Sequence, residues 1–356
     1  MRAILLILLI NFTLNAQDAL EIKKHLKGKT VFDICNDGEN LWIATHGDGV
    51  YKYSPKKNKW NNYSTQNDEL QINLFYSVAA NKKYVWAGST DGLFIFDKQR
   101  GKWSKRKFGK GGQLSNWIRS LEYDPFIDAV WIGRFQYLTK YDVKRRRFTD
   151  YDLTIKKDEK SNTIKVIEVD GDSLVWFGTE NGLHKYNKKK DIDEKGSILY
   201  YDNRLNYFNG EGQEVSIASI LFEQGFIWIG LDEFITRENK NYNVGGLYKF
   251  DRRNEWTRFD TRNGMKGNGV FDIELIGNYL WVSQYQFIAS TKEGYGRGLV
   301  LVNRITEEVS PIVDNQIPEN IYKIHFFGNS VWLGTGEGLV EIDLSNNFVE
   351  HFKSKK

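Results

Sequence analysis

The chain has 356 residues, of which 15% are aromatic and only four are proline, and its 50 basic and 46 acidic residues give a formal net charge of +4. This composition is typical of a strand-rich globular protein and excludes a disordered chain. The balanced charge provides no general attraction to nucleic acid, so we expect no nucleic-acid partner. The single cysteine, Cys35, excludes an intrachain disulfide, so stability must come from the packed core.

The first sixteen residues differ from the rest. Arg2 precedes an unbroken apolar run over residues 3–10, and a small residue, Ala16, ends the segment. This pattern is typical of a cleaved signal peptide, and the run is too short to span a bilayer as a stop-transfer helix. We predict a signal peptide over residues 1–16, a lead segment over 17–29, and an exported protein, periplasmic or at the cell surface, with no membrane span. The alternative is a buried N-terminal strand.

From residue 30 onward the chain repeats one unit seven times. Each unit has a tryptophan between two apolar residues, followed by a small residue, at intervals of 44 to 53 residues. The tryptophans are Trp42, Trp86, Trp131, Trp176, Trp228, Trp281 and Trp332. A fixed period in this range is typical of repeat architectures. We expect these side chains to form a core between repeats rather than ligand platforms.

The first unit illustrates the expected secondary structure. Residues 31–34, 41–44, 50–53 and 60–63 are short apolar or alternating runs separated by turn residues. Four antiparallel strands cannot bury both faces alone, whereas seven such sheets arranged radially can. The predicted fold is an all-β, seven-bladed β-propeller of four-stranded antiparallel blades over residues 30–356. We expect the last blade to own its fourth strand, at 349–352; alternatively, residues 19–23 supply it.

Three stretches carry a family resemblance. Residues 86–93, 176–183 and 332–339 each have a tryptophan, then an apolar residue and glycine, and later Gly-Leu. This pattern resembles the two-component regulator propeller repeat. The resemblance implies the periplasmic sensor half of a membrane histidine kinase, often one that senses glycans. Here it covers the sensor module alone, without a kinase, so it implies that signalling would need a separate membrane protein as partner.

Three turns between the second and third strands depart from the repeat. They are Arg134–Tyr137 in the third unit, residues 231–244 in the fifth, and residues 284–298, which include Tyr285, in the sixth. In a propeller these turns open on one face. Long loops on a rigid scaffold are where binding residues gather, and aromatic, arginine and amide groups suit sugars or a protein partner. The alternative is ordinary variable surface loops.

A second set of residues should reach the same face. One aligned position near the start of each first strand should approach the mouth of the central channel. It holds Phe32, Tyr76, Arg119, Lys165, Ala218, Phe271 and Tyr322. Basic and aromatic groups that converge there would suit an acidic or glycan ligand. The alternative is hydrated channel lining whose groups pair with one another.

The sequence contains no decisive catalytic motif. There is no zinc spacing, full calcium loop or nucleophile elbow, so we predict no metal and no cofactor. We predict a non-catalytic, sensor-like propeller that binds a glycan or a protein on its loop-rich face. One alternative is a polysaccharide lyase for an acidic glycan, with His46 or Tyr76 as base and Arg119 or Lys165 neutralising the substrate carboxylate. Another is a protein-interaction scaffold.

Overall fold

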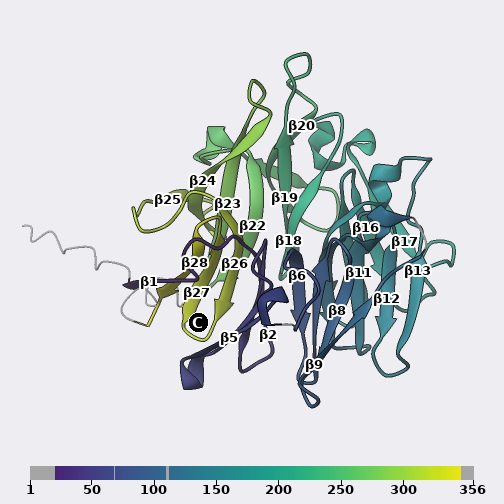
Figure 1. Cartoon of the computed structure of the whole chain (residues 1–356). Helices are drawn as coiled ribbons and strands as arrows, with labels where there is room; N and C mark the ends of the chain where they lie inside the picture. The colour runs from purple at the N-terminus through teal and green to yellow at the C-terminus, as the bar shows by residue number, and fades with distance from the viewer. Residues whose placement is uncertain (1–20, 68, 110–111, 346–356) are drawn as a thin grey trace, which may run out of the picture.

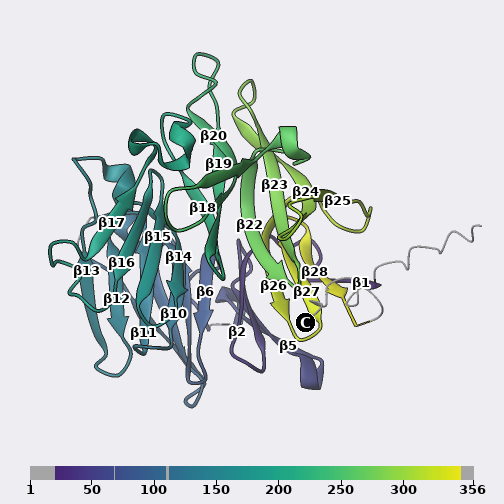
Figure 2. The same ribbon diagram turned by 180° about the vertical axis from the view of Figure 1, so that it is seen from behind.

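A computed structural model describes residues 21–67, 69–109 and 112–345. Seven four-stranded antiparallel sheets stand around a central channel (Figures 1 and 2), which confirms the predicted propeller. Within the described residues, no helix is long and apolar enough to cross a membrane. The predicted signal peptide and the strand expected at 349–352 lie outside the described residues.

The strands run from the channel outward in each blade. Blade 1 comprises β2 (Val31–Asn36), β3 (Leu41–Thr45), β4 (Val50–Ser54) and β5 (Lys59–Tyr63), and blade 2 comprises β6 (Phe75–Ala80), β7 (Tyr84–Ser89), β8 (Gly92–Asp97) and β9 (Lys102–Arg106). Blade 3 comprises β10 (Ile118–Asp124), β11 (Ala129–Arg134), β12 (Leu138–Asp142) and β13 (Arg147–Tyr151), and blade 4 comprises β14 (Ile164–Asp170), β15 (Leu174–Thr179), β16 (Leu183–Asn187) and β17 (Ile198–Tyr201).

The remaining blades have longer middle strands. Blade 5 comprises β18 (Ile217–Glu223), β19 (Phe226–Phe234), β20 (Asn243–Phe250) and β21 (Trp256–Phe259), and blade 6 comprises β22 (Gly269–Ile276), β23 (Tyr279–Ile288), β24 (Glu293–Asn303) and β25 (Val309–Ile312). Blade 7 comprises β26 (Ile321–Phe327), β27 (Ser330–Thr335), β28 (Gly338–Asp343) and β1 (Glu21–His25). Short 3-10 helices in the connections are η1 (Pro55–Lys57), η2 (Thr65–Asn67), η3 (Gln113–Asn116), η4 (Glu159–Asn162), η5 (Asn203–Leu205), η6 (Tyr207–Gly210) and η7 (Thr261–Asn263).

The repeat tryptophans form the core between blades, as predicted. Each is at most 2% exposed. Trp176 of blade 4, for example, packs with Ile220 and Ile227 of blade 5. Burying a side chain of this size removes 150 Å² or more from water, which makes these residues the main source of inter-blade stability.

Close packing between blades explains the glycine two positions after the tryptophan in blades 4 and 5. A Cβ added at Gly178 would lie 2.6 Å from Cγ2 of Ile217, on the first strand of the next blade. At Gly230 the corresponding distance, to Cγ1 of Val270, is 2.5 Å. The next blade therefore approaches the backbone so closely at this position that a side chain would have to displace it.

The ring closes differently from our preferred expectation. Strand β1 pairs antiparallel with β28, with Glu21 opposite Asp343 and His25 opposite Leu339. The outermost strand of blade 7 is thus supplied by the N-terminal side of the chain, in agreement with the alternative prediction and not with the preferred one. This pairing gives β28 a partner on its outer edge and joins the two ends of the ring, so it also leaves no exposed ladder on that edge.

Four blade interfaces share an ionic clamp. An acid at the end of the innermost strand accepts a hydrogen bond from the tryptophan indole of its own blade and pairs with a base that follows the third strand of the next blade. Asp124, for example, accepts from Trp131 Nε1 at 3.4 Å and from Lys188 Nζ at 2.8 Å. The four acid–base pairs are Asp37–Lys98, Asp124–Lys188, Asp170–Arg252 and Glu223–Arg304.

Candidate functional site

A β-bulge recurs near the start of every innermost strand. The register shifts by one residue between Val31 and Asp33 in β2, and the six other innermost strands show the same shift. The unpaired residues are Phe32, Tyr76, Arg119, Lys165, Ala218, Phe271 and Tyr322. A bulge re-aims a side chain that would otherwise follow the strand alternation. Each of these residues except Ala218 therefore places a large side chain at the mouth of the channel, and all seven line the channel cavity.

Aromatic rings form one side of the mouth. Phe32 stacks on Tyr76 with centroids 5.5 Å apart, and it meets Tyr322 edge-on at 5.2 Å. Tyr322 also contacts Phe271, with ring centroids 5.3 Å apart, and Tyr76 also contacts Trp117, with ring centroids 5.4 Å apart. We call these five rings the aromatic arc. It spans blades 6, 7, 1 and 2 and ends at the start of blade 3. All five side chains are half-buried; four of the rings line the channel cavity, and Trp117 packs against Tyr76 without lining it.

Charged pairs form the other side, over blades 3 to 5. We call this side the charged arc; it comprises Arg119 with Glu180, Lys165 with Asp232, and Lys160 with Glu214. Arg119 Nη1 lies 2.6 Å from Glu180 Oε1. Lys160 Nζ lies 2.6 Å from Glu214 Oε2. Each cation thus has a carboxylate partner from a neighbouring blade or connection, so the arc is close to neutral.

These pairings perturb the acid–base properties of their members. Burial by itself would raise the pKa of Asp232, but Lys165, together with a hydrogen bond from Ser216 and the charge of Arg119, more than offsets it, and the pKa is lowered. Burial likewise opposes the charge on Lys160, but hydrogen bonds to Glu214 and Tyr242 raise its pKa. Asp232 and Lys160 are therefore charged at neutral pH.

Two tall hairpins border the mouth. β19–β20 and β23–β24 rise above the ring (Figures 1 and 2). The departure predicted as a loop in blade 6 is mostly strand, whereas that in blade 5 is strand only at its two ends, with residues 235–242 as the connection between them. The hairpins contact each other: Phe234 and Phe287 have ring centroids 4.8 Å apart, and the backbone N–H of Phe287 donates to Glu233 at 2.7 Å. A cavity of about 660 Å³ lies between these hairpins and the charged arc. Strands hold its walls more rigidly than free loops would.

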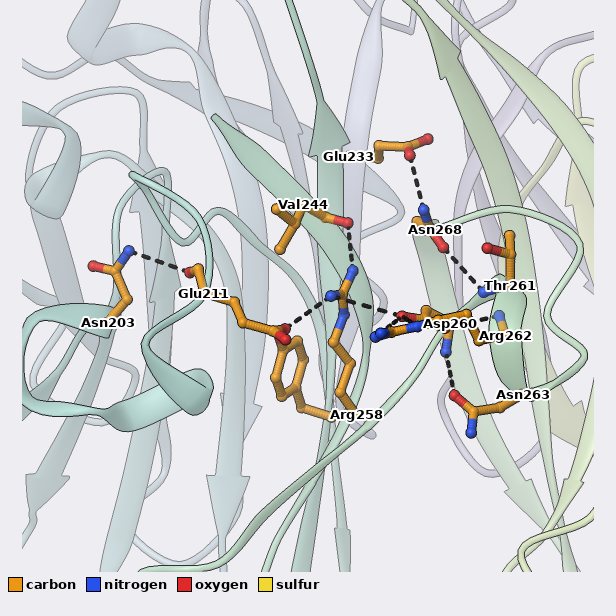
Figure 3. A network of polar contacts seen from close by, with 11 residues as sticks. Asn203, Glu211, Glu233, Val244, Arg258, Asp260, Thr261, Arg262, Asn263 and Asn268 are labelled. Carbon is orange, nitrogen blue, oxygen red and sulfur yellow. Dashed lines mark hydrogen bonds and ion pairs between the residues drawn. The ribbon is translucent and has the colours of Figure 1, made fainter. Parts of the chain in front are cut away.

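A polar network anchors the base of the blade 5 hairpin (Figure 3). Arg258 donates to Glu211 and to the backbone carbonyl of Val244, each at 2.8 Å. Asn268 donates to Glu233 at 3.0 Å, which orients the carboxylate that also holds the second hairpin. The network thus fixes both hairpins from below the cavity.

The channel beneath the mouth carries an excess of acids. Below the bulge positions, five acids face the channel: Asp33, Glu122, Glu168, Asp272 and Glu274. Among the described residues that line this part of the channel, Lys323 is the only lysine or arginine. Burial raises the pKa of Glu168 to about 7 and that of Glu274 to about 8. Lys323 stays charged because, although burial opposes its charge, these carboxylates raise its pKa. In the described part of the chain, no three His, Cys, Asp or Glu side chains are arranged to hold a metal ion.

Seven of the nine predicted binding residues line the two cavities. They are Phe32, Tyr76, Arg119, Lys165, Phe271, Tyr285 and Tyr322. Arg134 and Tyr137 do not line either one. The Arg134 side chain is fully buried, lies 3.0 Å from Asp150 and covers the ring of Phe108. The blade 3 turn is tight, so it brings neither residue to the mouth.

Sequence reasoning missed several residues of the site. Trp117, Lys160, Glu180 and Asp232 were not singled out. Trp117 carried a usable signal, because it is a tryptophan outside the repeated unit and two positions before Arg119. Glu180 and Asp232 carried no such signal. Each pairs with a cation from a different blade, and the sequence does not reveal that proximity.

Comparisons with known proteins agree with the fold. No family model matches the chain. A histidine kinase, P4, of Formosa agariphila is 26% identical over 149 residues, which cover 39% of this chain and 11% of the kinase. The extracellular domains of the putative hybrid two-component systems BT4673 and BT3049 of B. thetaiotaomicron superpose with TM-scores of 0.66 and 0.65, at 17% and 16% identity. This chain covers 40% and 42% of them, and 91% of this chain is covered in each case.

Virginiamycin B lyase from Staphylococcus aureus has a similar fold, with a TM-score of 0.65, 13% identity, and coverage of 92% of this chain and 100% of the lyase. Identities this low establish the fold alone. The chain is thus a seven-bladed propeller similar in fold to the extracellular domains of putative hybrid two-component systems, and it spans less than half the length of those relatives.

Proposed function

We propose that this protein is an exported, non-catalytic binding propeller that recognises a glycan in the cavity at the channel mouth. The observation that carries the proposal is the meeting of the aromatic arc and the charged arc at the mouth, where Phe271 and Tyr322 of the first and Arg119 and Lys165 of the second line both the channel cavity and the hairpin cavity. Aromatic faces pack against the apolar faces of sugar rings, while carboxylates, amides and ammonium groups accept from and donate to hydroxyls.

The charge distribution favours an uncharged glycan over an acidic one. Arg119 and Lys165 already have carboxylate partners, so the mouth presents no unpaired cation from this pair of residues. An acidic sugar would have to displace Glu180 or Asp232 and leave that carboxylate without its cation, which costs more than the new contact returns. A neutral sugar can bind both members of each pair without breaking it.

The lyase alternative requires a base at the mouth. Burial raises the pKa of Tyr76, which lowers the fraction of phenolate available to act as a base at neutral pH below that of an ordinary tyrosine. His46 is exposed and lies edge-on to Phe32 and Tyr76, at 5.2 and 5.8 Å. Arg119, the proposed neutraliser, is already paired with Glu180. The binding function requires no such base.

A thermal-shift screen of residues 17–356 against neutral and acidic oligosaccharides tests the proposal. A ligand that binds only the native state raises its stability, by about 2.7 kcal/mol at a hundred times Kd. We expect neutral sugars to stabilise the protein and Tyr322→Ala, which removes a ring that lines both cavities, to abolish the shift. Tyr151→Ala, which removes another half-buried tyrosine on the outer strand β13, is the matched control.

The outcomes separate the alternatives. Growth of absorbance at 235 nm with an acidic glycan would indicate unsaturated uronates and would replace the proposal with a lyase. No shift with any glycan would overturn glycan recognition and favour a protein partner. If Tyr322→Ala and Tyr151→Ala weaken binding equally, the ligand does not occupy the mouth.

A further inference from the structure

The interface between blades 2 and 3 lacks both members of the ionic clamp. Asn81 occupies the position of the acid, and Val143 occupies the position of the base. The indole N–H of Trp86 is buried and has no hydrogen-bond partner among the described residues. Asn81 uses its side-chain oxygen to accept from the backbone N–H groups of Lys83 and Tyr84, each at 2.8 Å. This seam is thus held by apolar packing without the ion pair.

A cavity of about 760 Å³ opens at this seam, on the face opposite the mouth. It is bordered by the turns between β6 and β7, between β10 and β11, and between β12 and β13. Its lining includes Lys82 and Lys83 from the first turn, and Lys144 and Arg146 from the third. These four residues are exposed, and we call them the basic cluster.

The charges of the basic cluster are not balanced by its surroundings. The two acids that line the cavity are Asp37 and Asp128. Asp37 is engaged by Lys98 Nζ at 2.5 Å, and Asp128 accepts from Tyr123 Oη at 3.0 Å. None of the four cations forms an ion pair with another residue in the described ranges. The cavity therefore presents a surplus of positive charge, unlike the charged arc at the mouth.

Aromatic surface lies beside the cations. Tyr123 stacks on Trp86 with centroids 5.7 Å apart, Tyr84 lies 5.9 Å from Trp86, and both tyrosines line the cavity. The combination of a guanidinium, three ammonium groups and aromatic ring surface matches an anionic group on a partly apolar body.

We propose that this pocket binds an oxyanion group, a sulfate or phosphate ester, carried by a small ligand. Arg146 can pair with two oxygens of such a group, and the lysines supply point charges around it. This site is distinct from the mouth and does not rest on the glycan proposal.

Isothermal titration of the full chain at low and at moderate salt tests the pocket, with sodium pyrophosphate and a defined disulfated disaccharide as probes. We expect at least one probe to bind and binding to weaken as salt rises. The double variant Lys144→Gln/Arg146→Gln should weaken that binding by about tenfold or more, because each charge-assisted contact contributes roughly a factor of ten. Binding of pyrophosphate alone identifies phosphate as the group, and binding of the disaccharide alone identifies sulfate.

Two controls keep the result specific. Lys56→Gln/Lys57→Gln removes the same charge from the corresponding turn of blade 1, outside this cavity, and should leave the affinity unchanged. Tyr322→Ala, at the mouth, should leave it unchanged as well. The proposal is overturned if neither probe binds at low salt, or if both double variants weaken binding equally, since that result would mean diffuse attraction to the surface.

Discussion

The clamp between blades 3 and 4 provides a direct measure of how the blades are held together. The side chains of Lys188 and Asp124 are 3% and 0% exposed, and their charged atoms lie 2.8 Å apart. Lys188→Met keeps the aliphatic stem but removes the cation, so Asp124 remains buried with only hydrogen bonds from Trp131 and a backbone N–H. Breaking a buried pair by removing one partner costs about 3–5 kcal/mol. We expect the free energy of unfolding to fall by about 3 kcal/mol.

Urea denaturation followed by tryptophan fluorescence measures this loss through the midpoint and slope of the transition. Replacing both partners, in Asp124→Asn/Lys188→Met, removes the uncompensated charge and should recover most of the stability. Lys189→Met changes the exposed neighbour and should be nearly neutral. The reasoning is refuted if Lys188→Met costs no more than Lys189→Met, or if the double variant is no more stable than Lys188→Met.

Three further predictions follow from the blade geometry and the channel acids. Gly178→Val should cost about 1–3 kcal/mol in urea unfolding by overpacking against Ile217, and an unchanged midpoint would contradict the close approach. Glu168 and Glu274 hold protons more tightly when folded, with pKa values of about 7 and 8 against 4.5 unfolded, so stability should fall as pH rises from about 4.5 to 8. Glutamine at both positions should flatten that profile, and an unaltered slope would count against buried channel acids. Deleting residues 21–25 should lower the thermal midpoint strongly, because β28 loses its outer partner; an unchanged midpoint would show that β1 is dispensable.

The fold was predictable because the repeat is dominated by local and nearest-neighbour interactions. A buried tryptophan strand with turn residues on either side recurs in each unit, so one blade predicts the others. The ring closure was not predictable in the same way. Residues 21–25 and residues near the C-terminus both have a suitable strand pattern, and the sequence does not show which of them pairs with β28.

The candidate site was predictable only where the repeat itself positions a residue. The bulge occurs at the same place in every innermost strand, so alignment of the repeats identified Phe32, Tyr76 and Tyr322. Sequence reasoning misplaced Arg134. Its turn departs from the repeat, and we interpreted that departure as an exposed residue, whereas the guanidinium is buried against Asp150. A departure from a repeat indicates a local change in structure, and the direction of that change depends on neighbouring side chains.

Charge counted along the sequence also gave a misleading expectation for the ligand. Arg119 and Lys165 at the mouth suggested an acidic ligand, but Glu180 and Asp232 neutralise them across blade boundaries. The surplus of positive charge instead lies on the opposite face, at the basic cluster. An acidic glycan should therefore bind the face with the basic cluster, the underside, more readily than the mouth. The attraction depends on the charge that remains after ion pairing, not on the number of cations present. A binding signal from an acidic glycan must accordingly be mapped with Lys144→Gln/Arg146→Gln and Tyr322→Ala: loss in the first variant alone places it on the underside, and loss in the second alone would contradict the charge argument made for the mouth.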